Sequence, residues 1–410
     1  MREDLSRLMT ERNLDAIVVS GKVHGNPPLT YLTKGAGLTQ ALIIQKRGAA
    51  PQAIINPMER EEAAVLGYPL TLSSRYKYHD LLREHDGDAL QATVAYYARI
   101  FEDLGVQGRV GFYGLADQGQ AYALLTAVEE SLPDIHVVAE FQDDLISAAR
   151  TTKDTAEVAR IREMGRRTAE IVRQTEAFLR EHAVDDEEQL RRADGEILTV
   201  GDVHAHIRRL VALQGLEDPE GFIFATGRDS GIPHSKGRLE TPMRLGESIV
   251  FDIFPCEAGG GYFFDMTRTF CLGYAPDKLQ HIYDDVFACT RHIIANLDVG
   301  TPTRRYQQMT CAFFRERGYA TVEEDASVLS GYIHSLGHGV GLELHETPMF
   351  RDTPDNTAQI APGHVFTVEP GLYYPDEGMG CRIEDVIYID PDGNIQNLTD
   401  YPYQLVIPMA

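Results

Sequence analysis

Cysteine pairs, long apolar runs and positive charge are what this chain has least of. Its five cysteines are odd in number, scattered, and never arranged as Cys-x-x-Cys; they are Cys256, Cys271, Cys289, Cys311 and Cys381. This pattern argues against a disulfide framework or a zinc knuckle and predicts reduced thiols in a cytoplasmic protein. No apolar run is long enough to span a bilayer, and the charged, amphipathic start lacks the apolar region of a signal peptide. We therefore expect no membrane segment.

Basic residues are outnumbered in the composition. Lysine and arginine total 38 against 62 aspartates and glutamates, for a formal net charge of −24, and no basic cluster offsets this excess. A surface that binds nucleic acid or an anionic membrane needs such a cluster, so we expect neither kind of partner. Most of the acidic side chains are expected to solvate the surface. A few lie in apolar stretches and need another explanation.

The length of 410 residues predicts two domains, because single cores usually stop growing below this size. We place the boundary near Arg150, with an N-terminal domain of residues 1–150 and a C-terminal domain of residues 151–410. The first domain alternates between helical and β-rich stretches and has no phosphate-loop or dinucleotide fingerprint, which indicates an α/β domain. Helices are expected at 2–13, 58–67, 88–105 and 117–133, and strands at 16–21, 41–45, 51–57, 109–114 and 136–140.

The C-terminal domain is expected to begin with a long charged helix at 155–183. Thr199 is a suitable N-cap for the next helix, because its side-chain oxygen can accept from the first free amides. A strand is expected at 221–227, and two further helices at 277–297 and 302–318.

The same domain contains an internal repeat. Two β-rich stretches, 246–252 and 363–369, each run from a glycine to an acid six residues later. Each is followed by a glycine-containing turn and a second β-rich stretch that carries another acid. Self-similarity of this kind predicts two related halves of one α+β domain, with the acids meeting at its centre.

These four acids form two pairs. A hairpin with its turn at 258–259 would place Asp252 directly opposite Asp265. A second hairpin of the same kind would place Glu369 opposite Glu384. Opposite residues of an antiparallel pair project from one face with Cβ atoms roughly 5 Å apart, so each pair would repel itself.

Four converging carboxylates are unfavourable unless protons or cations neutralise them, so the pattern predicts a centre of two divalent metal ions. Ordinary acids on solvent-facing strand positions are the alternative, but the duplicated pattern in apolar strands favours the metal. Carboxylates with a single imidazole suit Mn²⁺, Co²⁺ or Fe²⁺, with Zn²⁺ possible. A paired-metal site usually activates a bridging water and polarises a carbonyl or phosphoryl oxygen.

Three histidines lie where chemistry is plausible, although structural roles stay open for each. His338 lies between glycines, which loosen the backbone and let the ring approach a crowded ion pair. Strand-like alternation would set Glu343 and His345 on one face and Leu342, Leu344 and Glu346 on the other. His234 lies in a loop just after a β-rich stretch, a usual place for functional side chains.

Four motifs together resemble the pita-bread metallopeptidases (family M24), which include methionine aminopeptidase, aminopeptidase P and prolidase. The motifs are VFDIFPCEAGGGYFFDMTRTF, HSLGHGVGLELHETP, FTVEPGLYY and CRIEDV. The resemblance covers about residues 151–410, and the motifs follow the family's order. The first 150 residues look like the smaller α/β domain of the proline-directed branch and of creatinase. The implied fold is a pita-bread domain with a pseudo-two-fold repeat, preceded by a creatinase-N-like domain.

The resemblance also implies roles for single residues. His234 and His345 match histidines that contact the substrate and steady the tetrahedral intermediate, and Glu369 would also shuttle protons. Arg382 and His334 match residues of the proline-directed branch that would bind substrate. Five residues match the metal ligands: Asp252, Asp265, His338, Glu369 and Glu384. Of these, Asp265 and Glu384 match the acids that bridge both ions.

The implied activity is hydrolysis of the peptide bond before proline, by an Xaa-Pro aminopeptidase or an Xaa-Pro dipeptidase with a metal-bridging hydroxide as nucleophile. The substrate would be a small peptide with proline in second position, and Mn²⁺ is the first choice of metal. The resemblance further implies a homodimer in which a neighbour's N-terminal domain walls the cleft.

One feature departs from the family's pattern. Asp252 and Asp265 are 13 residues apart, more than is common in the family, and Phe254-Pro255 stands where a glycine is usual. The odd spacing preserves the opposed acids but changes the pocket wall. A metal-dependent lyase or an amidinohydrolase-like enzyme acting on a non-peptide substrate is therefore the alternative, and a non-catalytic binding module is a third.

Overall fold

The structure is a computed structural model that describes residues 4–409. The described residues divide into two compact units: 4–150 together with 259–261 form one, and 151–258 together with 262–409 form the other. None of the helices in residues 4–409 combines the length and apolar character needed to cross a membrane.

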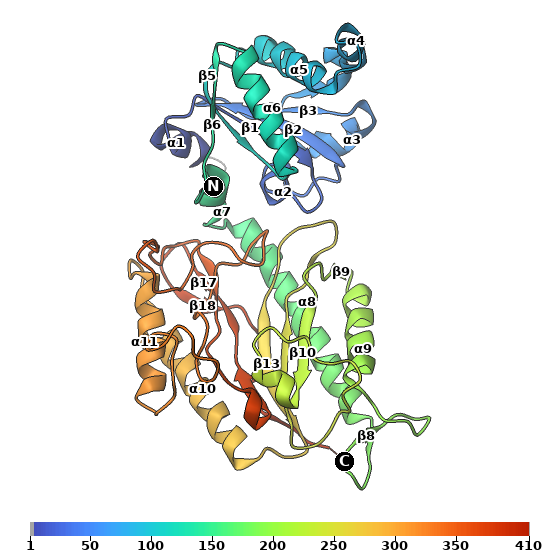
Figure 1. Ribbon diagram of the computed structural model, residues 1–410, viewed down its shortest axis with the longest axis vertical. Helices are drawn as coiled ribbons and strands as arrows, with labels where there is room; N and C mark the ends of the chain where they lie inside the picture. The colour runs from blue at the N-terminus through green and yellow to red at the C-terminus, as the bar shows by residue number, and fades with distance from the viewer. Residues whose placement is uncertain (1–3, 410) are drawn as a thin grey trace. The chain divides into compact units, whose positions relative to one another are not determined.

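The first unit is built on a six-stranded mixed sheet. Helices α5 (Ala89–Leu104) and α6 (Gln118–Ser131) pack on one face of it (Figure 1). Val18, Tyr97 and Phe101 belong to the core between these helices and the sheet. In sheet order the strands are β4 (Leu70–Leu72), β3 (Gln52–Ile55), β2 (Gln40–Lys46), β1 (Ala16–Lys22), β5 (Gly108–Tyr113) and β6 (Ile135–Val138).

Most elements predicted for this unit are confirmed. The five expected strands are present, and the helix expected at 2–13 contains α1 (Asp4–Glu11), with positions 2 and 3 outside the described residues. The stretch 58–67 forms only short turns of helix, η1 (Pro57–Glu59), α3 (Arg60–Ala63) and η2 (Ala64–Leu66). The prediction missed β4 and the short helical elements α2 (Pro27–Thr33), η3 (Ser73–Tyr76), α4 (Tyr78–Glu84) and α7 (Leu145–Arg150).

Four long helices frame the second unit, all of them predicted from the sequence. Helix α8 (Thr155–Arg180) and α9 (Val200–Leu213) each begin at a capping box, with Asp154 and Thr199 as N-caps. Helices α10 (Asp277–Ala295) and α11 (Thr303–Arg315) lie on the other side of the strands from α8 and α9 (Figure 1).

The strands of the second unit form two central groups that meet at the middle. One group is a four-stranded sheet of β10 (Phe222–Thr226), β11 (Ser248–Ile253), β13 (Met266–Leu272) and β19 (Val406–Ile407). The other contains β14 (Val365–Val368), β17 (Asp385–Ile389) and β18 (Ile395–Asn397), with the hairpin β15 (Gly371–Tyr374) and β16 (Met379–Arg382). Short strands at the edges are β7 (Ala183–Val184), β8 (Leu190–Arg191), β9 (Leu216–Glu217) and β12 (Cys256–Glu257).

Hydrogen bonds join the two groups. The amide of Glu384 donates to the Thr267 carbonyl at 3.1 Å, and the amide of Arg382 donates to Thr269 Oγ1 at 2.9 Å. The start of β13 therefore lies against the segment between β16 and β17. This contact brings the two acid-bearing halves together.

The register predicted for the first acid pair is wrong by two residues. Asp252 lies opposite Thr267, not Asp265, because the connection is centred on Gly259-Gly260 rather than on Ala258-Gly259. Both glycines have positive φ, of 89° and 82°, which suits a tight turn at that point. A shift of two residues keeps both acids on one face, so Asp265 is a diagonal neighbour of Asp252.

The register predicted for the second pair is confirmed. Gly371 pairs with Arg382 in one ladder and Val368 with Asp385 in the other, and both ladders share the register that sets Glu369 opposite Glu384. The two glutamates lie in the break between these ladders.

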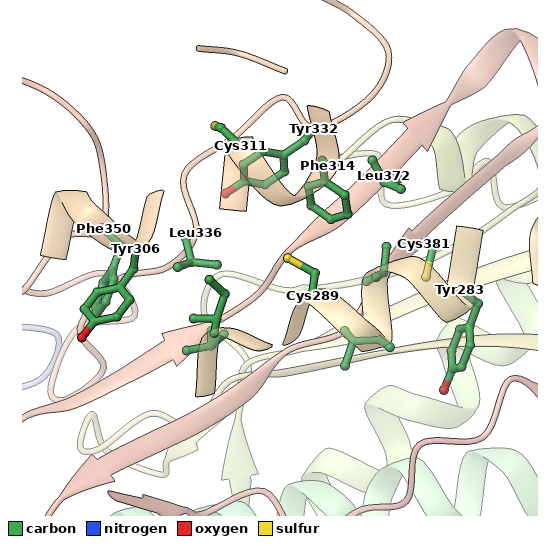
Figure 2. Packing of buried hydrophobic residues seen from close by; sticks show 14 of the residues in the cluster. Tyr283, Cys289, Tyr306, Cys311, Phe314, Tyr332, Leu336, Phe350, Leu372 and Cys381 are labelled. Carbon is green, nitrogen blue, oxygen red and sulfur yellow. The ribbon is translucent and has the colours of Figure 1, made fainter. Parts of the chain in front are cut away.

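A large apolar core fills the space between α10, α11 and the second group of strands. Figure 2 shows part of it around Cys289, Phe314 and Tyr332, all of which are buried. All five cysteines of the chain are free and buried, which confirms the prediction of unpaired thiols.

Candidate metal centre and active site

The four predicted acids come from four different chain segments of the second unit. Asp252 lies on β11 and Asp265 just before β13, while Glu369 follows β14 and Glu384 lies between β16 and β17. They line one cavity of about 460 Å³. The same cavity is lined by the other five residues singled out from the sequence: His234, His334, His338, His345 and Arg382.

His338 faces the carboxylates with an unprotonated nitrogen. Its Nδ1 lies 3.1 Å from the carbonyl oxygen of Gly339, and since a carbonyl can only accept, Nδ1 carries the proton. Nε2 then presents its lone pair 3.6 Å from Asp265 Oδ2 and 3.4 Å from Glu369 Oε1. Burial and the neighbouring His345 ring lower the pKa of His338 to about 3, so the imidazole stays neutral, as a metal ligand must be.

The glycines around His338 allow close approach of the chain rather than looseness. A Cβ at Gly337 would lie 2.1 Å from the Thr367 carbonyl oxygen, and one at Gly339 would lie 2.2 Å from that of Thr347. Neither glycine has a positive φ. The loop is pressed against β14 and against its own return, and any side chain there would push His338 away from the acids.

The carboxylates repel one another in a buried site. Burial, then the charges of Glu384 and Asp252, raise the pKa of Asp265 well above its usual range. Burial and Glu384 do the same to the pKa of Glu369, and burial with Asp252 raises the pKa of Glu384 to about 8. These shifts have two physical causes, which are burial away from water and repulsion between neighbouring carboxylates.

The donor set fits a cation. One oxygen each of Asp252, Asp265 and Glu384 is buried without a hydrogen-bond partner among residues 4–409. Ligand atoms of Asp265, His338 and Glu384 lie within 4.8 Å of one another, close enough to share an ion. Unpaired buried carboxylate oxygens beside a neutral imidazole are the ligand chemistry of a divalent metal.

Arg382 is buried and held by four hydrogen bonds within the protein. Its guanidinium donates to Asp252 Oδ2 at 2.5 Å, to Tyr373 Oη at 2.7 Å and to Thr267 Oγ1 at 3.1 Å. The fourth bond, at 3.3 Å, goes to the carbonyl of Pro233, the residue before His234. Arg382 thus connects strand β11, which carries Asp252, with strand β15, which carries Tyr373, and with the loop that carries His234.

Tyr373 links Arg382 to His334. Nδ1 of His334 lies 2.7 Å from the Ser335 carbonyl and so carries the proton, which makes Nε2 the acceptor of the Tyr373 hydroxyl at 2.9 Å. Burial and the charge of Arg382 lower the pKa of His334 to about 3. A neutral His334 therefore forms the end of a fixed chain from Asp252 through Arg382 and Tyr373.

His345 and His234 stand on the open side of the cavity. Both are exposed, and the ring of His345 lies 4.3 Å from that of His338, centroid to centroid. The stretch 342–346 is not a strand, contrary to prediction, but its burial alternates as expected, with Leu342, Leu344 and Glu346 buried. Burial and the neighbouring His234 lower the pKa of His345, so its ring is neutral at neutral pH.

Sequence reasoning missed three polar residues of the site. Thr267 donates to Glu384 Oε2 at 2.8 Å, Tyr373 joins Arg382 to His334, and Lys236 lines the cavity. Two of them had a detectable signal: Thr267 is two residues from Asp265 and Tyr373 four from Glu369, positions that share a strand face. Lys236 had none beyond its place near His234.

Residues 159–391 match the family described as metallopeptidase family M24. The chain is 26% identical over 406 residues to the uncharacterized peptidase YqhT of Bacillus subtilis, covering 99% of both chains. It is 31% identical over 193 residues to the Xaa-Pro dipeptidase of Pyrococcus furiosus, covering 47% of this chain and 51% of that one. The solved structure of an Xaa-Pro dipeptidase from Bacillus anthracis superposes with a TM-score of 0.73 at 23% identity, covering 99% of each chain. These likenesses confirm the predicted fold class.

Proposed function

The chain belongs to metallopeptidase family M24, and from that premise we propose that it hydrolyses the peptide bond before proline in small peptides, as an Xaa-Pro aminopeptidase or Xaa-Pro dipeptidase. The resemblance predicted from the motifs is confirmed, and the chain is a metallopeptidase. The single observation that carries the proposal is the convergence of all nine predicted residues on one cavity.

Two divalent ions, Mn²⁺ as first choice with Co²⁺, Zn²⁺ or Fe²⁺ as alternatives, fit the acidic end of this cavity. Asp252, Asp265 and Glu384 would each supply a ligand oxygen, since each has a buried oxygen that lacks a hydrogen-bond partner within the described chain. The full set of ligands would be Asp252, Asp265, His338, Glu369 and Glu384. When bound, such ions lower the pKa of water and polarise a carbonyl group.

The surrounding side chains would move protons and hold charge. Glu369 accepts the proton of the attacking water and delivers it to the proline nitrogen as the carbon–nitrogen bond breaks. A neutral His345 keeps one N–H, and with His234 it donates to the oxygen on which negative charge develops. Arg382 and His334 form the wall beside them and fix the substrate's position through their rigid hydrogen-bonded chain.

The apolar part of the cavity lining suits a proline ring. It includes Ile223, Phe254, Leu344 and Met349. Phe254 packs with Leu344 in a small buried cluster, so the departure at this position produces a firm hydrophobic surface. A ring without an N–H group, such as proline, can be buried on this surface at no hydrogen-bonding cost.

The finer organisation follows the same proposal. Residues 1–150 would be the creatinase-like N-terminal domain and residues 151–410 the catalytic domain, working as a homodimer. A cytoplasmic location agrees with five buried free thiols.

The test is release of the N-terminal residue from Ala-Pro and Ala-Pro-Ala by protein loaded with Mn²⁺, compared with Ala-Ala and Ala-Ala-Ala. We expect cleavage of the proline peptides only, lost on chelation and restored by Mn²⁺. Metal-loaded protein that cleaves the alanine peptides equally well, or cleaves none of the four, would refute the proposal.

A further inference from the structure

We propose that Lys236 binds the C-terminal carboxylate of the substrate and so makes short peptides, dipeptides above all, the preferred substrates. This inference rests on the proposed function and adds to it the feature that selects peptide length. Two lysine or arginine side chains line the cavity among the described residues, Arg382 and Lys236. They differ in how many N–H donors and how much positive charge remain available to a ligand.

Arg382 has little capacity left for a substrate. Its four hydrogen bonds within the protein engage all three nitrogens of the guanidinium, and its positive charge is matched by Asp252. Binding a carboxylate with two parallel bonds would require breaking a buried ion pair, which is costly. Arg382 therefore shapes the wall more than it attracts an anion.

Lys236 is in the opposite situation. It is exposed, two residues after His234, and its ammonium donates to the main-chain carbonyl of Glu220 at 2.8 Å. An ammonium has three N–H donors, and a carbonyl oxygen neutralises no charge. The contact fixes the position of the ammonium and leaves both donors and charge for a carboxylate.

The same contact holds the ammonium at the cavity of the acids. Glu220 is three residues before Ile223, which lies directly opposite Asp252 in the sheet. Glu220, Ile223 and Lys236 line the same cavity as the four acids, so the ammonium and the carboxylates face one space. In an Xaa-Pro dipeptide the C-terminal carboxylate belongs to the proline itself, directly after the scissile bond.

The charge of the whole chain makes a local cation necessary. With a formal net charge of −24, the protein repels the carboxylate of any free peptide. A fixed ammonium at the cavity offers the carboxylate a positive charge to bind. Glu220 also lines the cavity, and its negative charge affects His345 instead. It raises the pKa of His345 and so partly offsets the lowering caused by burial.

A second cavity beside Lys236 could accept the additional residues of longer peptides. This cavity of about 530 Å³ shares Glu220 and Lys236 with the first and continues to Arg208. The carboxylate of a tripeptide would lie beyond Lys236 and lose the direct contact. Tripeptides are therefore expected to bind more weakly than dipeptides and to depend less on Lys236.

The experiment uses metal-loaded protein and two ligands that cannot be cleaved. They are an Ala-Pro analogue with a reduced scissile bond (CH₂–N in place of CO–N) and its C-terminal carboxamide. Calorimetric titration should show that Lys236→Met weakens binding of the acid about tenfold and leaves binding of the carboxamide unchanged. Lys236→Arg should restore most of the loss, and Lys278→Met, an exposed lysine that does not line the cavity, should match wild type.

Kinetics on Ala-Pro and Ala-Pro-Ala separate this inference from the proposed function. We expect Lys236→Met to raise KM for the dipeptide about tenfold with kcat nearly unchanged, and to affect the tripeptide less. Equal weakening of the acid and the carboxamide, or none of either, overturns the role of Lys236 even if wild type cleaves proline peptides. Failure of wild type to cleave either peptide refutes the proposed function, while a selective loss of acid binding would still support Lys236 as the carboxylate site.

Discussion

Single side chains at the centre of the second unit are held in protonation states that water would not favour. The pKa values of Asp265 and Glu369 are raised by burial and by the neighbouring acids, while burial lowers that of His338. Ionised carboxylates are therefore unfavourable in the metal-free protein, whereas a bound cation needs ionised carboxylates and a neutral imidazole and would supply the missing positive charge. The first predictions therefore concern what single substitutions do to metal binding.

Glu384→Gln should abolish metal binding and reduce turnover at least a thousandfold. The substitution keeps the shape and the hydrogen bond from Thr267 but removes the charge that balances the ions. Because it also removes repulsion from Asp252, the metal-free variant should be as stable as wild type or more so. Metal content by elemental analysis and thermal unfolding without metal measure the two effects. Asp376→Asn, an exposed acid in the hairpin turn, is the control and should change neither.

His345→Ala and His338→Ala should separate catalysis from metal binding. His345 stands on the open side of the cavity, so its loss should lower kcat by a factor of about 10² to 10⁴ with metal content unchanged. His338 faces Asp265 and Glu369, so its loss should release metal and abolish activity together. If His345→Ala lost its metal, the division of roles between the two rings would be wrong.

At the scale of elements, the loop that carries both rings is closed by Glu346. Its amide and carbonyl both pair with Gly339 at 2.8 Å, and its Oε1 accepts from the amides of Leu342 and Glu343. Its Oε2 accepts from the ammonium of Lys153 at 2.9 Å, and the two side chains are 4% and 2% exposed. A buried ion pair just before α8 thus holds the loop of His338 and His345.

Lys153→Met should lower the free energy of unfolding by about 3 kcal/mol, because it leaves the Glu346 carboxylate buried without its cation. Adding Glu346→Gln should recover much of this loss, since a neutral amide oxygen still accepts from Leu342 and Glu343. Urea unfolding of wild type, both single variants and the double variant measures the coupling. Lys278→Met removes an exposed ion pair with Glu377 and should change stability by less than about 1 kcal/mol. Additive effects of the two substitutions would show that the pair is not coupled.

Long elements were predictable from the sequence and tight connections were not. Helices α8 to α11 carry strong periodicity, and α8 and α9 also begin at capping boxes. The second acid pair was placed in the correct register because the ladders on either side of Glu369 and Glu384 share one register. The register predicted for the first hairpin was wrong because the turn is centred on Gly259-Gly260, and a run of glycines does not specify which residues pair. The short helix α2 was missed because it begins with two prolines, which are more typical of loops, although proline also fits the first turn of a helix.

The site was predictable where its residues follow an element's period. Asp252, Glu369 and Glu384 lie on strands or directly at their ends, so their facing directions follow from alternation. The bonds of Arg382 to Pro233 and Tyr373 were not predictable, because they depend on where a loop from another part of the chain returns. The loop around His338 was interpreted as loosened by glycine, whereas its glycines permit close packing that becomes visible only with its neighbours in place.

At the scale of the whole molecule, folding must bring four acids into a buried centre of a chain that already carries a net charge of −24. Cations that bind the folded chain and not the unfolded one stabilise it by an amount that grows with the logarithm of their free concentration above the dissociation constant. Stability should therefore depend on metal and on pH together, and the direction of each follows from the raised pKa values.

In metal-free protein, stability should fall as pH rises from 7.0 to 8.5. The pKa of Glu384 is about 8 in the folded state and about 4.3 in the unfolded state, so near pH 7 the folded chain holds a proton that the unfolded chain has lost. Raising the pH removes that proton from the folded state alone, which costs about 1 kcal/mol over this range. Buried thiols, such as Cys271 and Cys381 with pKa values raised to about 12, shift stability in the same direction. Comparison with Glu384→Gln isolates the contribution of the acid.

The measurement is the urea midpoint of wild type and Glu384→Gln at pH 7.0 and 8.5, without metal and with saturating Mn²⁺. Without metal, the wild-type midpoint should fall more steeply than that of the variant. With Mn²⁺ the wild-type difference should shrink or reverse, because deprotonation frees the oxygens that bind the ion. The variant should not respond to Mn²⁺. Parallel pH slopes for the two proteins without metal would mean that Glu384 is ionised in the metal-free fold, and the buried acids would then not be the repelling cluster that a metal must neutralise.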